Sequence, residues 1–149
     1  MLYGISPMIT PDLLKVLMEM GHGDRLVIAD ANFPAYSIAK STVSGTTVHQ
    51  PGCTAAAILD AILKLLPLDD AVETPVVYMM AQPETDIPPI HRDFAEILCR
   101  HGYQERQMAA VDRFAFYRQA RQSYAILKTG EESRFANLIL QKGIITQQN

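Results

Sequence analysis

The feature that most constrains the fold is an apolar run at residues 26–29, which has polar and turn-forming residues on both sides within the stretch 21–37. So short a run between turn formers is typical of a strand buried inside a sheet. Ligands of open α/β sheets bind outside the carboxyl ends of strands, so Asp30, directly after the run, occupies a typical binding position. The glycine-flanked loop before the run carries His22, and we expect this loop to return the imidazole toward Asp30. A histidine and a carboxylate facing one cavity could serve as acid and base near neutral pH.

Both residues also have a structural interpretation. A histidine that follows a helix-ending glycine is usually a surface or capping residue. An aspartate after a strand is usually a turn former whose side chain bonds the local backbone. The spacing of His22 and Asp30 leaves both interpretations open.

Segments typical of strands alternate with segments typical of helices along the whole chain. This alternation predicts a single α/β domain over residues 1–149, with a mixed sheet of about six strands and helices on both faces. The order of the strands does not follow from the pattern. The predicted strands are 26–29, 41–49, 75–81, 107–111, 123–128 and 138–140; the predicted helices are 10–20, 55–66, 90–101 and 113–121, with a Pro-rich loop at 82–89 and a polar tail after 143.

Composition excludes several classes of protein. The net charge of −3 and the absence of basic clusters argue against a nucleic-acid partner. No apolar stretch approaches the ~20 residues of a membrane span, and the N-terminus resembles no secretory signal. Cys53 and Cys99 form no CxxC pair, so we expect two reduced thiols, a cytoplasmic location and no metal site. The absence of GxGxxG and GxxxxGK[ST] argues against a nucleotide cofactor.

Further polar residues stand at predicted element ends. The planar fork of Arg113 could hold a sugar hydroxyl pair or a carboxylate, and the amide of Asn137 suits vicinal hydroxyls. A solvated arginine and a capping asparagine are the structural alternatives. Of the other histidines, His91 and His101 fall in one predicted helix as surface or packing residues, and His49 falls in a loop after a strand.

Several strings of the sequence resemble, in the same order, those of the L-fucose mutarotases, which share a superfamily with the D-ribose pyranases. They are ISPMITPDLLKVLMEMGHGDRLVIADANFPAYS, DRFAFY, SYAILKTGE and FANLILQKG. The resemblance spans nearly the whole chain and is weakest at 40–72 and 82–106. It implies an α/β fold with a mixed sheet between helices, and a ring-like homo-oligomer, often a decamer, with sites near subunit contacts.

The resemblance also implies roles for individual residues. His22, in the GHGD string, corresponds to the proton donor of the family, and Asp30 to its sugar-binding aspartate. Arg113 corresponds to an arginine of the fucose type, where ribose-type relatives tend to carry histidine. Asn137 fits the family pattern, but Phe135 stands where a tyrosine is usual, which puts the substrate in doubt more than the chemistry. Either Tyr36 or Tyr117 could supply the missing hydroxyl.

These residues lead to a hypothesis of a cofactor-free mutarotase that interconverts the anomers of a monosaccharide, with L-fucose favoured. Mutarotation needs a proton donor for the ring oxygen and a base for the anomeric hydroxyl, and water can be that base. Asp24 could set the tautomer of His22. Two alternatives stay open: a pyranase or mutarotase for another sugar such as ribose, and a non-catalytic sugar-binding module.

Overall fold

The computed structural model describes residues 2–82 and 87–145, so the predicted loop at 82–89 and the polar tail lie partly outside the described residues. All six predicted strands and all four predicted helices form, with shifted ends. The strands are β1 (Arg25–Ala29), β2 (Thr47–Gln50), β3 (Val76–Met79), β4 (Met108–Val111), β5 (Ala125–Thr129) and β6 (Leu138–Gln141). The helices are α1 (Pro11–Glu19), α2 (Ala35–Ala39), α3 (Ala55–Leu63), α4 (Pro89–Arg100) and α5 (Arg113–Arg121), with a 3₁₀ turn η1 (Glu105–Gln107).

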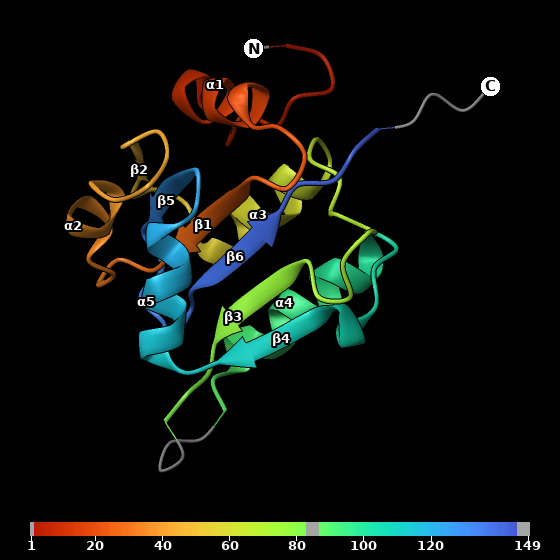
Figure 1. Cartoon of the computed structure of the whole chain (residues 1–149). Helices are drawn as coiled ribbons and strands as arrows, with labels where there is room; N and C mark the ends of the chain where they lie inside the picture. Colours follow the sequence, from red (N-terminus) through yellow and green to blue (C-terminus); the bar gives the residue numbers. More distant parts are fainter. Residues whose placement is uncertain (1, 83–86, 146–149) are drawn as a thin grey trace.

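The strands form one mixed sheet in the order β2-β5-β1-β6-β3-β4. The pairs β1–β5, β2–β5 and β3–β4 are parallel. β6 runs antiparallel to both of its neighbours, β1 and β3. Only β6 is therefore reversed. The carboxyl ends of the other five strands and the start of β6 meet at one edge of the sheet, and β6 ends at the opposite edge beside the start of β1 (Figure 1).

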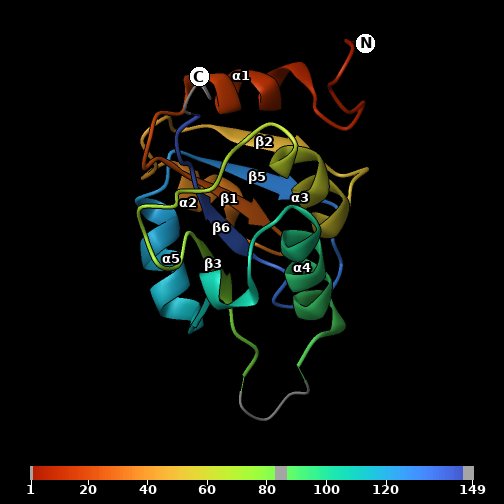
Figure 2. The same ribbon diagram turned by 90° about the vertical axis from the view of Figure 1, so that its right-hand side faces the viewer.

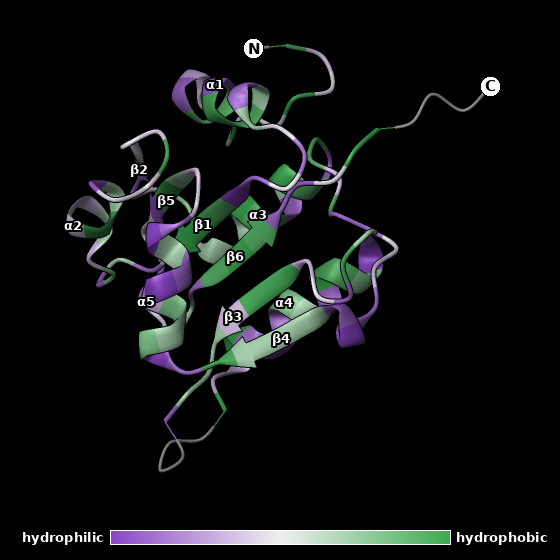
Figure 3. Ribbon diagram, viewed as in Figure 1, coloured by the Kyte–Doolittle hydropathy of each residue, from purple (hydrophilic) through white to green (hydrophobic). Residues whose placement is uncertain are grey.

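Helices cover both faces of the sheet, as the sequence predicts. α2 and α5 lie on one face and α3 and α4 on the other (Figure 2). The buried side chains of α1 join the cluster of α3 and α4, and Thr10 at the start of α1 lies beside Gln50 at the end of β2. Hydrophobic residues concentrate in the central strands (Figure 3). Among the described residues, no helix combines the length and the apolar content that a bilayer crossing requires.

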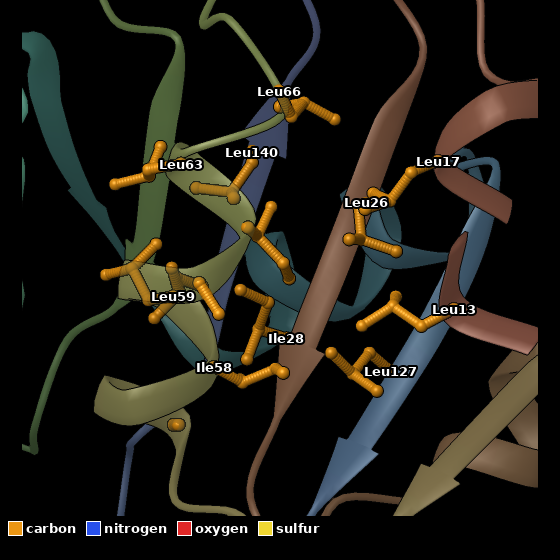
Figure 4. Close-up of a cluster of buried hydrophobic side chains, with 14 of the residues drawn as sticks. Leu13, Leu17, Leu26, Ile28, Ile58, Leu59, Leu63, Leu66, Leu127 and Leu140 are labelled. Atoms are coloured by element: carbon orange, nitrogen blue, oxygen red, sulfur yellow. The ribbon is translucent and has the colours of Figure 1, made fainter. Parts of the chain in front are cut away.

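The apolar helix α3 is buried by its own chain. Thr54 caps it by accepting a hydrogen bond from the amide of Ala57. Side chains of α3 such as Ile58 and Leu59 are fully buried among leucines and isoleucines from α1, β1, β5 and β6 (Figure 4). The apolar composition of this helix is thus explained by the core, and it gives no argument for a subunit interface.

Two predictions about residues 32–49 are wrong. The strand predicted at 41–49 begins only at Thr47, because the preceding segment folds as turns around Gly45, whose φ is +65°. There the Ser44 hydroxyl donates a hydrogen bond to the carbonyl of Tyr124. Serine and threonine side chains often bond to the backbone in this way, and such bonds compete with strand pairing. His49 consequently lies within β2 rather than in a loop after it. The short helix α2 was not predicted, because five residues give too little periodicity to detect.

Candidate functional site

A cavity of about 300 Å³ opens at the edge where β1, β3 and β4 end and β6 begins. Its size lies at the lower end of the range for small-molecule sites. The residues that line it combine a carboxylate, two guanidinium groups and an aromatic wall: Asp30, Asn32, Phe33, Met79, Gln82, Arg113, Tyr117, Arg134, Phe135 and Asn137. Four sequence-predicted site residues, Asp30, Arg113, Phe135 and Asn137, therefore lie together, although they are up to 107 positions apart in the chain.

Asn137 holds Asp30 through a reciprocal pair of hydrogen bonds. The Asp30 amide donates to Asn137 Oδ1 at 2.9 Å, and Asn137 Nδ2 donates to Asp30 Oδ2 at 2.7 Å. The other carboxylate oxygen, Oδ1, accepts from the amide of Asn32 at 2.9 Å. Both residues are buried, so these bonds fix the carboxylate at the wall of the cavity. The side chain of Asn137 is therefore bonded to Asp30, and any contact with a ligand would be made in addition to these two bonds.

The pKa of Asp30 is raised above its ordinary value of 3.8, chiefly because burial penalises the charged form. The hydrogen bonds from Asn137 and from the Asn32 amide oppose this rise, and the negative charge of Glu131 adds to it. A buried carboxylate with spare lone pairs is a strong acceptor for ligand hydroxyls.

Arg113 reaches the cavity from the first turn of α5. Asp112 caps this helix by accepting from the amides of Phe114 and Ala115, at 2.8 and 3.0 Å. These bonds lower the pKa of the Asp112 carboxyl. The cap fixes the start of α5 and so places Arg113, whose guanidinium lies 5.0 Å from the ring centroid of Phe114.

Three aromatic rings form the apolar wall. Phe33 packs edge-on against Tyr117 with ring centroids 5.5 Å apart, and Phe135 lies beside them in the same buried cluster. Tyr117 thus lines the cavity, whereas Tyr36 packs against His49 instead. Of the two tyrosines considered for the missing hydroxyl, Tyr117 is the one at the site.

His22 lies at the opposite edge of the sheet, and the expectation that its loop returns it to Asp30 of the same chain is wrong. The loop before β1 bonds to the end of β6, where the Gly23 amide donates to the carbonyl of Lys142. The five-residue strand β1 separates the two side chains, and such a strand spans about 15 Å. His22 therefore does not line the cavity of its own chain.

The partner of His22 is Asp69. Its carboxylate lies 3.2 Å from His22 Nε2, in a chain segment that the sequence did not single out. Asp69 is buried and its pKa is lowered, first by the hydrogen bond from the side chain of Gln141 and then by that from the Ala71 amide. Asp24, expected to orient the imidazole, instead accepts from the Gly21 amide at 2.8 Å. His22 is half exposed, so its ring is accessible from outside the chain.

Of the other histidines, His91 and His101 pack within the chain, one of the two interpretations made from the sequence, while His49 is exposed on β2. His101 pairs with Asp60 at 3.0 Å, and His91 Nε2 lies 3.0 Å from the carbonyl oxygen of Phe135. Within residues 2–82 and 87–145, no group of three or more His, Cys, Asp or Glu side chains is arranged to hold a metal ion.

Sequence reasoning missed Asp69 and Arg134, and it named Tyr117 only as one of two candidates for the missing hydroxyl. Tyr117 falls one helical turn after Arg113, and that spacing could have indicated a shared face. Asp69 follows a proline-ended helix and pairs with residues far along the chain, a relation that no local pattern reveals.

The chain is similar to known proteins in both sequence and fold. The chain matches the model of the RbsD / FucU transport protein family over residues 3–145. An L-fucose mutarotase from Actinobacillus pleuropneumoniae is 39% identical over 145 residues, 97% of each chain. The structure of the Streptococcus pneumoniae fucose mutarotase in complex with L-fucose matches with a TM-score of 0.91 and 39% identity, over 97% of this chain and 100% of that one. Bacillus subtilis RbsD complexed with D-ribose, at 19% identity and a TM-score of 0.71 over 93% of this chain and 95% of that one, shares the fold.

Proposed function

Because the chain belongs to the RbsD / FucU transport protein family, we propose that it is a sugar mutarotase that interconverts the anomers of L-fucose. The observation that carries the proposal is the cavity around Asp30, which has the size and lining that a monosaccharide needs. Sugars bind through hydroxyl groups to planar polar side chains and through the apolar side of the ring to aromatic walls. The whole chain, residues 1–149, acts as one mutarotase domain in this proposal.

Asp30 and Arg113 hold the sugar hydroxyls. The fixed carboxylate of Asp30 accepts hydrogen bonds, while Arg113 donates two in parallel from its planar fork. Asn137 orients Asp30 and can extend the contact to the ligand, and Phe135 and Tyr117 supply the apolar wall. The hydroxyl of Tyr117 is the available replacement for the phenol that Phe135 lacks.

His22 acts as the proton donor, and it comes from a neighbouring copy of the chain. The support is geometric: His22 and Asp30 lie at opposite ends of β1, and no histidine is among the described side chains that line the cavity. An end-to-end contact between copies would bring the half-exposed His22 of one copy to the cavity of the next. Exposed apolar side chains flank both places, Met18 and Ile144 on the His22 side and Phe114 on the cavity side.

Asp69 prepares His22 for proton transfer. Its carboxylate stays ionised near neutral pH, since its pKa is lowered, and it fixes the orientation of the imidazole by accepting from Nε2–H. Nε2 faces Asp69, so Nδ1 is the nitrogen left for the sugar.

The reaction then needs only proton movements. Nδ1–H of His22 protonates the ring oxygen while a base, Asp30 or water, takes the proton of the anomeric hydroxyl. The bond between the anomeric carbon and the ring oxygen breaks and leaves an open-chain aldehyde. Rotation about the neighbouring carbon–carbon bond exposes the other face, and the reverse proton transfers close the ring. A positioned acid of this kind contributes about 10²–10⁴-fold to the rate.

A shared site requires an oligomer, and we propose a ring-like homodecamer. The contact is heterologous, since different surfaces meet, and such contacts form a ring where the rotation between copies closes. A cytoplasmic location accompanies this proposal, supported by Cys53 and Cys99, which are both free thiols.

Saturation-transfer NMR across a panel of sugars tests the function directly. Accelerated exchange between the anomers of L-fucose, with weaker acceleration for D-ribose, is the expected result. Faster exchange for ribose than for fucose would make the protein a pyranase-type enzyme. Sugar binding with unchanged exchange rates would make it a binding module, and either result contradicts the proposal.

A further inference from the structure

Phe135 has an unusual backbone conformation. Its φ is +61°, which makes it the one non-glycine residue with a positive φ in the part of the chain that the structure describes. Side chains other than glycine rarely adopt this conformation, and when they do the surroundings must hold it. Such residues often lie at functional sites, and Phe135 lines the cavity.

A residue of α4 contacts the backbone of Phe135. The Phe135 carbonyl oxygen lies 3.0 Å from Nε2 of His91, and because a carbonyl can only accept, Nε2 must carry the proton. The ring of Phe135 belongs to the cluster on the α5 face, whereas His91 lies on the α4 face. The hydrogen bond therefore ties the cavity wall to the opposite side of the sheet.

His91 itself has little freedom. It is 8% exposed, lies edge-on to Tyr78 with ring centroids 4.9 Å apart, and stacks on Phe94 at 6.4 Å. A ring fixed on two sides presents its donor in one direction, which suits a residue that sets the geometry of another.

We propose that His91 is a positioning residue of the sugar site, which holds the Phe135 carbonyl and thereby keeps the aromatic wall in place. The inference rests on the proposed function only in taking the cavity to bind sugar. Without this hydrogen bond, the backbone at Phe135 can relax to a negative φ. That change would carry the Phe135 ring away from the cavity.

Two variants of His91 separate its hydrogen bond from its packing. His91→Phe keeps an aromatic ring and removes the donor, while His91→Gln places an amide donor at nearly the reach of Nε2. Asp93→Asn, an exposed change in the same helical turn, is the matched control. We expect His91→Phe to weaken L-fucose binding by about two- to tenfold, the range for one hydrogen bond. The KM should rise while kcat is kept, since a wall contact is uniform binding, and His91→Gln should recover most of the loss.

Wild-type affinity in His91→Phe would overturn the proposal, and so would a His91→Gln variant as weak as His91→Phe. Two further readouts do not depend on catalysis: the imidazole tautomer of His91 from ¹⁵N NMR of the wild type, and φ of Phe135 in a crystal structure of His91→Phe. An unchanged positive φ in the variant refutes it, and a proton on Nδ1 instead of Nε2 in the wild type refutes it even if His91→Phe folds poorly. If the wild type neither binds nor interconverts sugars, the proposed function fails, while these readouts still decide the role of His91.

Discussion

Removing the side chain of Asn137 tests whether the reciprocal pair with Asp30 stabilises a buried carboxylate. In Asn137→Ala the Asp30 amide loses its acceptor, and a buried unpaired amide costs about 1–3 kcal/mol. Asp30 Oδ2 loses a bond to a charged group, worth about 1.5–3 kcal/mol. Water entering from the cavity offsets part of this. The free energy of unfolding should therefore fall by about 3 kcal/mol at pH 7.

The pH dependence of this loss follows from the raised pKa of Asp30. The folded state binds a proton more readily than the unfolded state between pH 3.8 and the raised pKa, so the cost of the buried charge disappears as the pH falls through that range. Losing Asn137 removes a bond that lowers the pKa, so the variant titrates at still higher pH. The deficit of Asn137→Ala should hence be largest at neutral pH and shrink toward pH 4.

Urea unfolding at both pH values, at one fixed protomer concentration, measures this deficit. Asn32→Ala is the matched control, because only its backbone amide bonds to Asp30 and its side chain is exposed. A loss of equal size at both pH values, or one no larger than that of Asn32→Ala, would refute the reasoning.

Three further predictions concern the catalyst, its specificity and its assembly. His22→Ala should slow fucose anomer exchange by about 10²–10⁴-fold with the fold intact, and near wild-type exchange would exclude His22 as the principal acid. Because the Tyr117 hydroxyl stands in for the missing phenol, Tyr117→Phe should weaken L-fucose binding by about two- to tenfold, the range for one hydrogen bond, while Phe135→Tyr should bring no gain; a gain of about two- to tenfold in Phe135→Tyr would mean that nothing replaces the phenol. Sedimentation at micromolar concentration should give the mass of ten subunits, and a monomeric mass would contradict the shared site.

The fold was predictable because its signals are local. Thr10 and Asp112 mark helix starts by chemistry that the structure reproduces, since each side chain accepts a hydrogen bond from an amide in the first turn. The buried strands carry short continuous apolar runs, such as 26–29, and a run of this kind between turn formers is typical of a strand inside a sheet. The order of the strands was not predictable, because it depends on which edges pair across long sequence separations.

The cavity residues were predictable for a similar reason, and the His22 site was not. Asp30 directly follows β1 and Arg113 comes two residues after the end of β4, so a parallel sheet brings both to one edge. His22 precedes β1, and the same topology sends it to the other edge, where it pairs with Asp69. The sequence shows that His22 and Asp30 are polar and flanked by turn-forming residues. It does not show that they lie at opposite ends of β1 in the folded chain.

The most direct test of the account is subunit complementation between His22→Ala and Asp30→Asn. Each variant alone should catalyse little anomer exchange. In oligomers re-formed from an equal mixture, about a quarter of the sites should pair an intact His22 from one copy with an intact Asp30 from another. Saturation-transfer NMR should then show recovery to about a quarter of the wild-type rate. Exchange no faster than the average of the two variants alone would mean that the two residues do not act in one shared site.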